Sequence, residues 1–278
     1  MRISRVAANC VGMSAAPLRG KTGFGLLSAV LLVTAFQLAV WAGPSPVETV
    51  PYVPPGTILP VRLDGTLDIG SLHPQERIEA RIGQEVPLPN KEKISLRSQV
   101  FATVTSVNKS DDGTVSVSLK FDQLENKNQS LAITASLRAL ASYQAVRNAQ
   151  MSLTGADAGT PTGWATTVQI GGDIRFGDGG KVRNRQKQTV GKGVIGGVLV
   201  HIAPNAAAGC EGADPANNRL QATWVFSADA CGVYDLKNVK IAHDGGSDPM
   251  GVVTLEFAKE DMKLESGAGF LLRTVRQQ

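Results

Sequence analysis

Short runs of alternating apolar and polar residues recur along the chain from residue 57 onward. In residues 57–63 (TILPVRL), Leu59, Val61 and Leu63 fall on one side, and polar Arg62 falls on the other. A period of two residues indicates a β-strand with one buried face. The same pattern predicts strands at 77–82, 115–121, 131–137, 198–202, 220–226, 233–241, 252–257, 262–264 and 270–275. Residues 94–107 are predicted as one long strand or as two strands broken near 97–99.

These runs predict an all-β protein, either a distorted antiparallel barrel or a two-sheet sandwich of about a dozen short strands. The first run, 57–63, and the last, 267–275 (GAGFLLRTV), are built alike. We therefore expect them to pair and to close the fold. Pro60 has no N–H to donate, so it should lie at a bulge or face away from its partner strand.

Two stretches interrupt the strand pattern. Residues 139–151 are predicted either as a helix or as the end of a strand followed by a loop. Residues 154–197 are rich in glycine and carry the basic run 181–192 (KVRNRQKQTVGK), which predicts a flexible insertion. On this interpretation the insertion separates a first β segment, 56–153, from a second, 198–278, that completes the same domain.

The N-terminal 43 residues have the composition of an export signal. They contain Arg2, Arg5, Arg19 and Lys21 but no acidic residue, and residues 22–43 carry no charge. This predicts a hydrophobic helix that acts either as a signal peptide cleaved after Ala42 or as a retained inner-membrane anchor at 22–43. Residues 44–55 form a proline-rich linker, and the remaining chain is expected in the periplasm or at the cell surface.

The charge of the chain depends on this leader. The sequence has 28 Lys+Arg and 24 Asp+Glu, and four of the basic residues lie in the leader. The part after the leader is therefore formally neutral, and nothing in its charge favours nucleic acid as a partner.

Cys210 and Cys231 are the only cysteines after the leader. Outside the cytoplasm such a pair usually forms a disulfide. A zinc site would need closely spaced ligands such as Cys-x-x-Cys, which the sequence lacks.

The sequence offers few candidates for chemistry. It contains no Gly-x-Ser-x-Gly and no His-Glu-x-x-His motif, and it predicts no catalytic residue, cofactor or metal. A weak alternative is an oxygen-rich metal site formed by Asp229, Asp235, His243 and Asp244, although turn formation explains these aspartates as well. Possible binding residues are Trp164, Lys181, Arg183 and Arg185, with an ordinary solvated loop as the alternative.

Two blocks of the sequence resemble known exported proteins. The first consists of PPGTILPVRLDGTLD, VFATVTSV and VSVSLKFDQL, and it resembles the β-barrel domain of type IV secretion and conjugal-transfer channel scaffold proteins. The second, LQATWVFSADACGVYDLKNVKIAH with DMKLESGAGFLLRTV, resembles uncharacterised exported bacterial β-domain proteins. The resemblance implies a β domain in the cell envelope and provides no catalytic residues.

The sequence therefore predicts a non-enzymatic cell-envelope protein, a structural or binding module for an envelope protein or a polysaccharide. It would contact the membrane through its N-terminal segment. The alternative is an extracytoplasmic hydrolase whose Asp/Glu pair comes together only in the fold.

Overall fold

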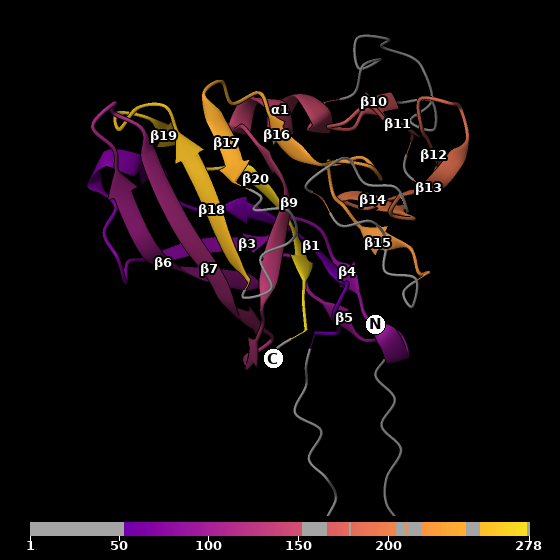
Figure 1. The fold of residues 1–278 in the computed structure, drawn as a ribbon. Helices are drawn as coiled ribbons and strands as arrows, with labels where there is room; N and C mark the ends of the chain where they lie inside the picture. The colour runs from indigo at the N-terminus through magenta and orange to yellow at the C-terminus, as the bar shows by residue number, and fades with distance from the viewer. Residues whose placement is uncertain are drawn as a thin grey trace, which may run out of the picture. The chain divides into compact units, whose positions relative to one another are not determined.

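The computed structural model describes residues 53–151, 166–177, 179–203, 210, 218–242 and 251–276. The expected N-terminal helix and most of the linker fall outside the described residues, as do Trp164, His243 and Asp244. The described chain consists mainly of β-strands, which form two large and two small sheets (Figure 1). The all-β prediction is confirmed at this level.

The larger sheet has ten strands and is nearly closed. Its order is β16 (Gly232–Tyr234), β9 (Ala135–Ala141), β20 (Gly269–Thr274), β1 (Ile58–Leu63), β3 (Arg77–Ile82), β6 (Gln99–Lys109), β7 (Val115–Asn126), β18 (Val252–Phe257) and β17 (Val239–Ala242), with β8 (Gln129–Ala132) paired to β7. The two end strands, β16 and β17, contact one another, which gives the sheet a barrel-like form. Apolar side chains from alternate positions, such as Leu59, Val61 and Leu119, fill one continuous core.

The predicted pairing of the first and last strands is correct. β1 runs antiparallel to β20, with Val61 opposite Phe270. These two strands are neighbours inside the sheet, however, so they do not close it; the sheet ends at β16 and β17. Pro60 is accommodated because its carbonyl accepts the N–H of Gly83 at 2.9 Å, while the ladder with β3 begins only at Val61. No N–H is therefore needed from Pro60 toward β3.

The second large sheet has six strands. Its order is β10 (Thr166–Val168), β11 (Ile174–Phe176), β12 (Lys181–Arg183), β13 (Thr189–Val194), β14 (Gly197–Val200) and β15 (Gln221–Ala222). The described part of the expected flexible insertion, 166–177 and 179–197, thus contains strands β10 to β13 and the start of β14. Some of the glycines serve close packing: a Cβ at Gly191 would lie only 2.7 Å from the Cα of Val200 in the neighbouring strand.

The remaining elements are short. β2 (Leu67–Asp68) pairs with β19 (Lys263–Leu264), and β4 (Val86–Pro87) pairs with β5 (Lys93–Ile94). Single 3₁₀ turns occupy Ile69–Ser71 and Pro89–Lys91. The helix α1 (Tyr143–Gln150) follows β9 directly, and its N-cap Ser142 accepts the N–H of Ala145. Residues 139–151 are thus the end of a strand followed by a helix.

Several predicted strands are divided or shortened. The run 94–107 is two strands, β5 and β6, because Arg97 adopts a φ of 68° between them. The run 131–137 splits because β8 pairs with β7 whereas β9 pairs with β20. Of the run 220–226 only β15 is a strand, since Trp224 has a φ of 56° and breaks the extended backbone.

Candidate functional site

The basic run 181–192 lies on two strands of the second sheet. In β12 the side chains alternate: Lys181 and Arg183 are exposed, while Val182 between them is fully buried. Val182 belongs to a second apolar cluster with Val198 and Val200 from β14. This packing fixes the inner face of the sheet and directs Lys181 and Arg183 to the opposite, outer face.

Exposed apolar side chains share this outer face. Val168 in β10 lies opposite Ile174 in β11, and Ile174 lies opposite Arg183. Val168, Ile174 and Phe176 each retain 38–40% of their accessible surface. The guanidinium carbon of Arg183 lies 5.7 Å from the centre of the Phe176 ring, a cation–π distance. Apolar and cationic groups are therefore interleaved on neighbouring strands.

Lys192 extends the same face onto β13. It lies directly opposite Lys181 in the β12–β13 ladder, and both lysines are exposed. Like charges directly opposite one another destabilise an antiparallel pair. We call the surface formed by Val168, Ile174, Phe176, Lys181, Arg183 and Lys192 the basic face.

Charge is concentrated in this part of the chain. Residues 166–203 contain six Lys/Arg and two Asp, a formal net charge of +4, whereas the chain after the leader is neutral. One of the two aspartates, Asp173, is buried and contributes nothing to the outer surface. The basic face is therefore a local positive region on a protein whose charges after the leader balance only as a whole.

Arg185, the fourth predicted binding residue, has a different position. Its Nη2 donates a hydrogen bond to the carbonyl of Gly171 at 2.8 Å, which ties the β12–β13 turn to the turn before β11. Nearby, the Asp173 carboxylate accepts the N–H of Ala228 at 2.7 Å. Burial raises the pKa of Asp173, and the charge of Asp229 adds to this, while the Ala228 hydrogen bond and Arg185 act in the opposite direction. Arg185 thus participates in the fold.

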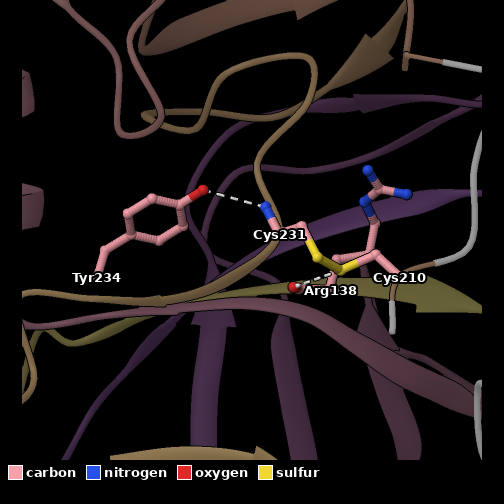
Figure 2. Close-up of a disulfide and its surroundings, with 4 residues drawn as sticks. All are labelled: Arg138, Cys210, Cys231 and Tyr234. Atoms are coloured by element: carbon pink, nitrogen blue, oxygen red, sulfur yellow. Dashed lines mark hydrogen bonds between the residues drawn. A yellow bond between two sulfur atoms is a disulfide. The ribbon is translucent and has the colours of Figure 1, made fainter. Parts of the chain in front are cut away.

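The predicted disulfide between Cys210 and Cys231 is present, with the two Cα atoms 6.1 Å apart. Figure 2 shows it beside β9: the Sγ of Cys210 lies 3.4 Å from the carbonyl oxygen of Arg138, and the N–H of Cys231 donates to the Tyr234 hydroxyl at 3.1 Å.

Arg138 itself is 2% exposed. Burial, with the charge of Arg273 adding to it, lowers the pKa of Arg138 to about 10, so this side chain stays cationic at neutral pH.

Of the four candidate metal ligands, only Asp229 and Asp235 lie within the described residues. Asp229 accepts a local hydrogen bond from Ser227, and Asp235 accepts one from Ser142, the N-cap residue of α1, so both carboxylates take part in contacts of the fold. Within the described residues, no group of three or more His, Cys, Asp or Glu side chains is placed to hold a metal ion. In the same part of the chain, no helix is long and apolar enough to cross a membrane.

The strand alternation of KVR at 181–183 already separates two cations from a buried valine, so it could have revealed the outward direction of Lys181 and Arg183. No comparable sequence pattern indicates that Ile174 and Phe176 are exposed on this face, because β11 is only three residues long and lies in a glycine-rich stretch.

The chain matches no family model, and no curated protein or solved structure is significantly similar to it. The fold and the basic face therefore define only a class: an all-β protein with a disulfide and a cationic, partly apolar sheet surface. A disulfide is typical of proteins in an oxidising compartment.

Proposed function

We propose that the protein is a non-enzymatic module of the cell envelope that binds an acidic surface polysaccharide through the basic face. The observation that carries this proposal is the direct opposition of Lys181 and Lys192. Two facing lysines repel each other and do not stabilise the sheet, whereas a polyanion lying across β12 and β13 would neutralise both charges.

Three further features support the proposal. The exposed Ile174 and Phe176 provide apolar surface against which the ring faces of a saccharide can pack. The disulfide fits a location outside the cytoplasm. The sequence resemblance to the β-barrel domain of secretion-channel scaffolds and to exported β-domain proteins also favours an envelope location.

The test compares two charge reversals in the full chain. Lys181→Glu places a glutamate opposite Lys192, so it should stabilise the ladder by about 0.2–1 kcal/mol while it weakens binding. Lys120→Glu, on the exposed surface of β7, is the matched control. Affinity would be measured by retention on immobilised alginate, an acidic polysaccharide, with neutral dextran as reference.

We expect wild type and Lys120→Glu to be retained on alginate with salt-dependent affinity, and Lys181→Glu to be at least tenfold weaker despite an unchanged or higher melting temperature. Equal retention of both variants would contradict the proposal. Binding to anionic lipid vesicles but not to alginate would also overturn it, in favour of membrane association.

The alternative function is a polysaccharide hydrolase with an Asp/Glu-based site. The observation in its favour is that Asp173 is buried with a second carboxylate, Asp229, close enough to act on it: burial raises the pKa of Asp173, and the charge of Asp229 adds to this. Release of reducing ends from alginate by the wild type, abolished in Asp229→Asn, would replace binding by catalysis as the function.

A further inference from the structure

A polar pocket lies at the opposite end of the β6–β7 hairpin from its turn. It has a volume of about 610 Å³, within the range of roughly 300–1,000 Å³ typical of small-molecule sites. Its walls are the loop between β5 and β6 and the two-residue turn between β7 and β8. We call it the end pocket.

The lining of the end pocket is cationic and rich in hydrogen-bonding groups. It contains three cations, Arg81, Arg97 and Lys127, and one carboxylate, Glu125, and the remaining lining is mostly serine, glutamine and asparagine. Within the described residues neither Arg97 nor Lys127 forms an ion pair. Two cationic side chains on the pocket wall are therefore available to an anionic ligand.

The third cation is held in place by the protein. Arg81 donates its Nε–H to Asp64, and this hydrogen bond raises the pKa of Arg81, so the guanidinium is always charged. Only Nε is used in this contact, and the two terminal nitrogens of the planar group form no hydrogen bond within the described residues. Their fork geometry suits a carboxylate.

The pocket walls are fixed to one another by Asn126, which is 9% exposed. Its Oδ1 accepts hydrogen bonds from the N–H of Ser95 and the hydroxyl of Ser98, both at 3.0 Å. Its Nδ2 donates to the carbonyl of Lys93 at 3.2 Å. The β5–β6 loop and the β7–β8 turn are thus joined before any ligand arrives, which lowers the entropic cost of binding.

The backbone adds a separate observation. Arg97, Lys127 and Asn128 have φ values of 68°, 49° and 67°, a left-handed conformation that favours glycine or asparagine. The β7–β8 turn, with positive φ at both central residues, normally prefers Asn-Gly, yet a lysine occupies its first position. Arg97 and Lys127 therefore occupy positions on the pocket wall where the backbone conformation favours glycine or asparagine. Local strain of this kind is found at functional sites.

We infer that the end pocket binds a carboxylated saccharide, such as a short oligomer of uronic acids. The cations would pair with the carboxylates, and the serine, glutamine and asparagine side chains would bond to the hydroxyl groups. This inference goes beyond the proposed function, because the pocket shares no residue with the basic face and takes a short ligand instead of a polymer.

The experiment measures binding of trigalacturonate to the full chain by calorimetry, with maltotriose as the neutral probe and glucose 6-phosphate as the phosphate probe. The variants are Arg97→Gly and Lys127→Asn, which remove a cation and suit the left-handed backbone. Lys91→Gly is the matched control, because Lys91 also has a positive φ, of 63°, but does not line the pocket.

We expect trigalacturonate to bind, and Arg97→Gly and Lys127→Asn to weaken it at least tenfold without lowering the melting temperature. Lys91→Gly and Lys181→Glu should leave its affinity unchanged, so failure here is distinct from failure of the basic face. Equal binding of maltotriose, preference for glucose 6-phosphate, or no binding of trigalacturonate would each overturn the inference.

Discussion

The hydroxyl oxygen of Thr274, in the last strand, accepts a hydrogen bond from the backbone N–H of Thr57, just before the first strand, at 2.9 Å. The same hydroxyl donates to the carbonyl of Pro54 at 2.7 Å, and the Thr57 hydroxyl donates to that carbonyl at the same distance. Both threonines are buried: Thr57 is 0% exposed and Thr274 is 2% exposed. The Pro-x-Gly-Thr sequence at 54–57 therefore anchors the start of the first strand to the end of the last.

Replacement of Thr274 by valine tests this anchor. Valine has the same shape but removes both hydrogen bonds of the hydroxyl, and the Thr57 N–H keeps only its longer bond to the Pro54 carbonyl at 3.2 Å, so we expect a loss of about 1–3 kcal/mol in the free energy of unfolding. Thr274→Ser keeps the hydroxyl and should recover most of the loss. Urea denaturation of the three proteins measures the difference, and a valine variant as stable as wild type would show that the anchor contributes nothing.

A second prediction concerns Gln84, which joins the two large sheets. Its Oε1 accepts hydrogen bonds from the N–H of Trp224 at 2.6 Å and of Val198 at 3.1 Å, and its Nε2 donates to the Val198 carbonyl at 2.8 Å. Gln84→Met would leave the N–H groups of Trp224 and Val198 without this acceptor, while the Val198 carbonyl would keep only the Thr223 N–H at 3.3 Å, at a cost of roughly 2–5 kcal/mol. Gln144→Met, on the exposed side of α1, is the control and should change stability little. Thermal unfolding that is identical for both variants would contradict this.

How much of the fold could be predicted depends on whether a feature is determined by neighbouring residues or by residues far apart in the sequence. β3 and β18 match their predicted bounds because alternation within six residues is a local property. In the second sheet, the predicted runs 198–202 and 220–226 overlap β14 and β15, whereas β10 to β13 were missed. β10, β11 and β12 are each only three residues long, and β13 has glycine at two of its six positions, so alternation extends over too few side chains to mark a strand. Gln84 was missed for another reason: its partners are 114 and 140 residues away, and no local pattern marks a glutamine that links two sheets.

The candidate sites also divide into those marked by neighbouring residues and those formed by residues far apart in the sequence. Lys181 and Arg183 could be selected because a basic run is visible in the sequence. The end pocket could not be, since Arg81, Arg97 and Lys127 are scattered along the sequence and meet only where strands β3, β6 and β7 are aligned. Arg185 belonged to the same basic run, yet it bonds to Gly171, because a run of charges does not reveal which member the fold itself uses.

The disulfide gives a third prediction. It closes a loop with a sequence separation of 21 residues and fixes the chain at Cys231, just before β16, beside Arg138 of β9. The double variant Cys210→Ser/Cys231→Ser should lose about 3 kcal/mol of stability, as expected from the entropy of a loop of this size. Calorimetry of the oxidised and reduced wild type provides the control, since reduction should reproduce the loss. A variant with the wild-type melting temperature would show that the bond is dispensable.

The last prediction concerns pH. The pKa of Asp173 is raised above its ordinary 3.8, chiefly by burial, so the folded protein holds this proton more tightly than the unfolded chain does. Below pH 3.8 the group is protonated in both states and carries no penalty. As the pH rises through 3.8 to the raised pKa, the unfolded chain releases its proton first, and the wild type loses stability.

Asp173→Asn removes this titration and keeps an oxygen for the Ala228 N–H, so the stability of the wild type relative to this variant should fall as the pH rises from about 3 to 7. Asp112→Asn is the control of opposite sign. A hydrogen bond from the Thr114 N–H lowers the pKa of Asp112, so its contribution is present above pH 3.8 and is lost as the pH falls through the lowered pKa. Urea denaturation at several pH values measures both differences. If the two differences changed with pH in the same direction, burial would not be the dominant influence on Asp173.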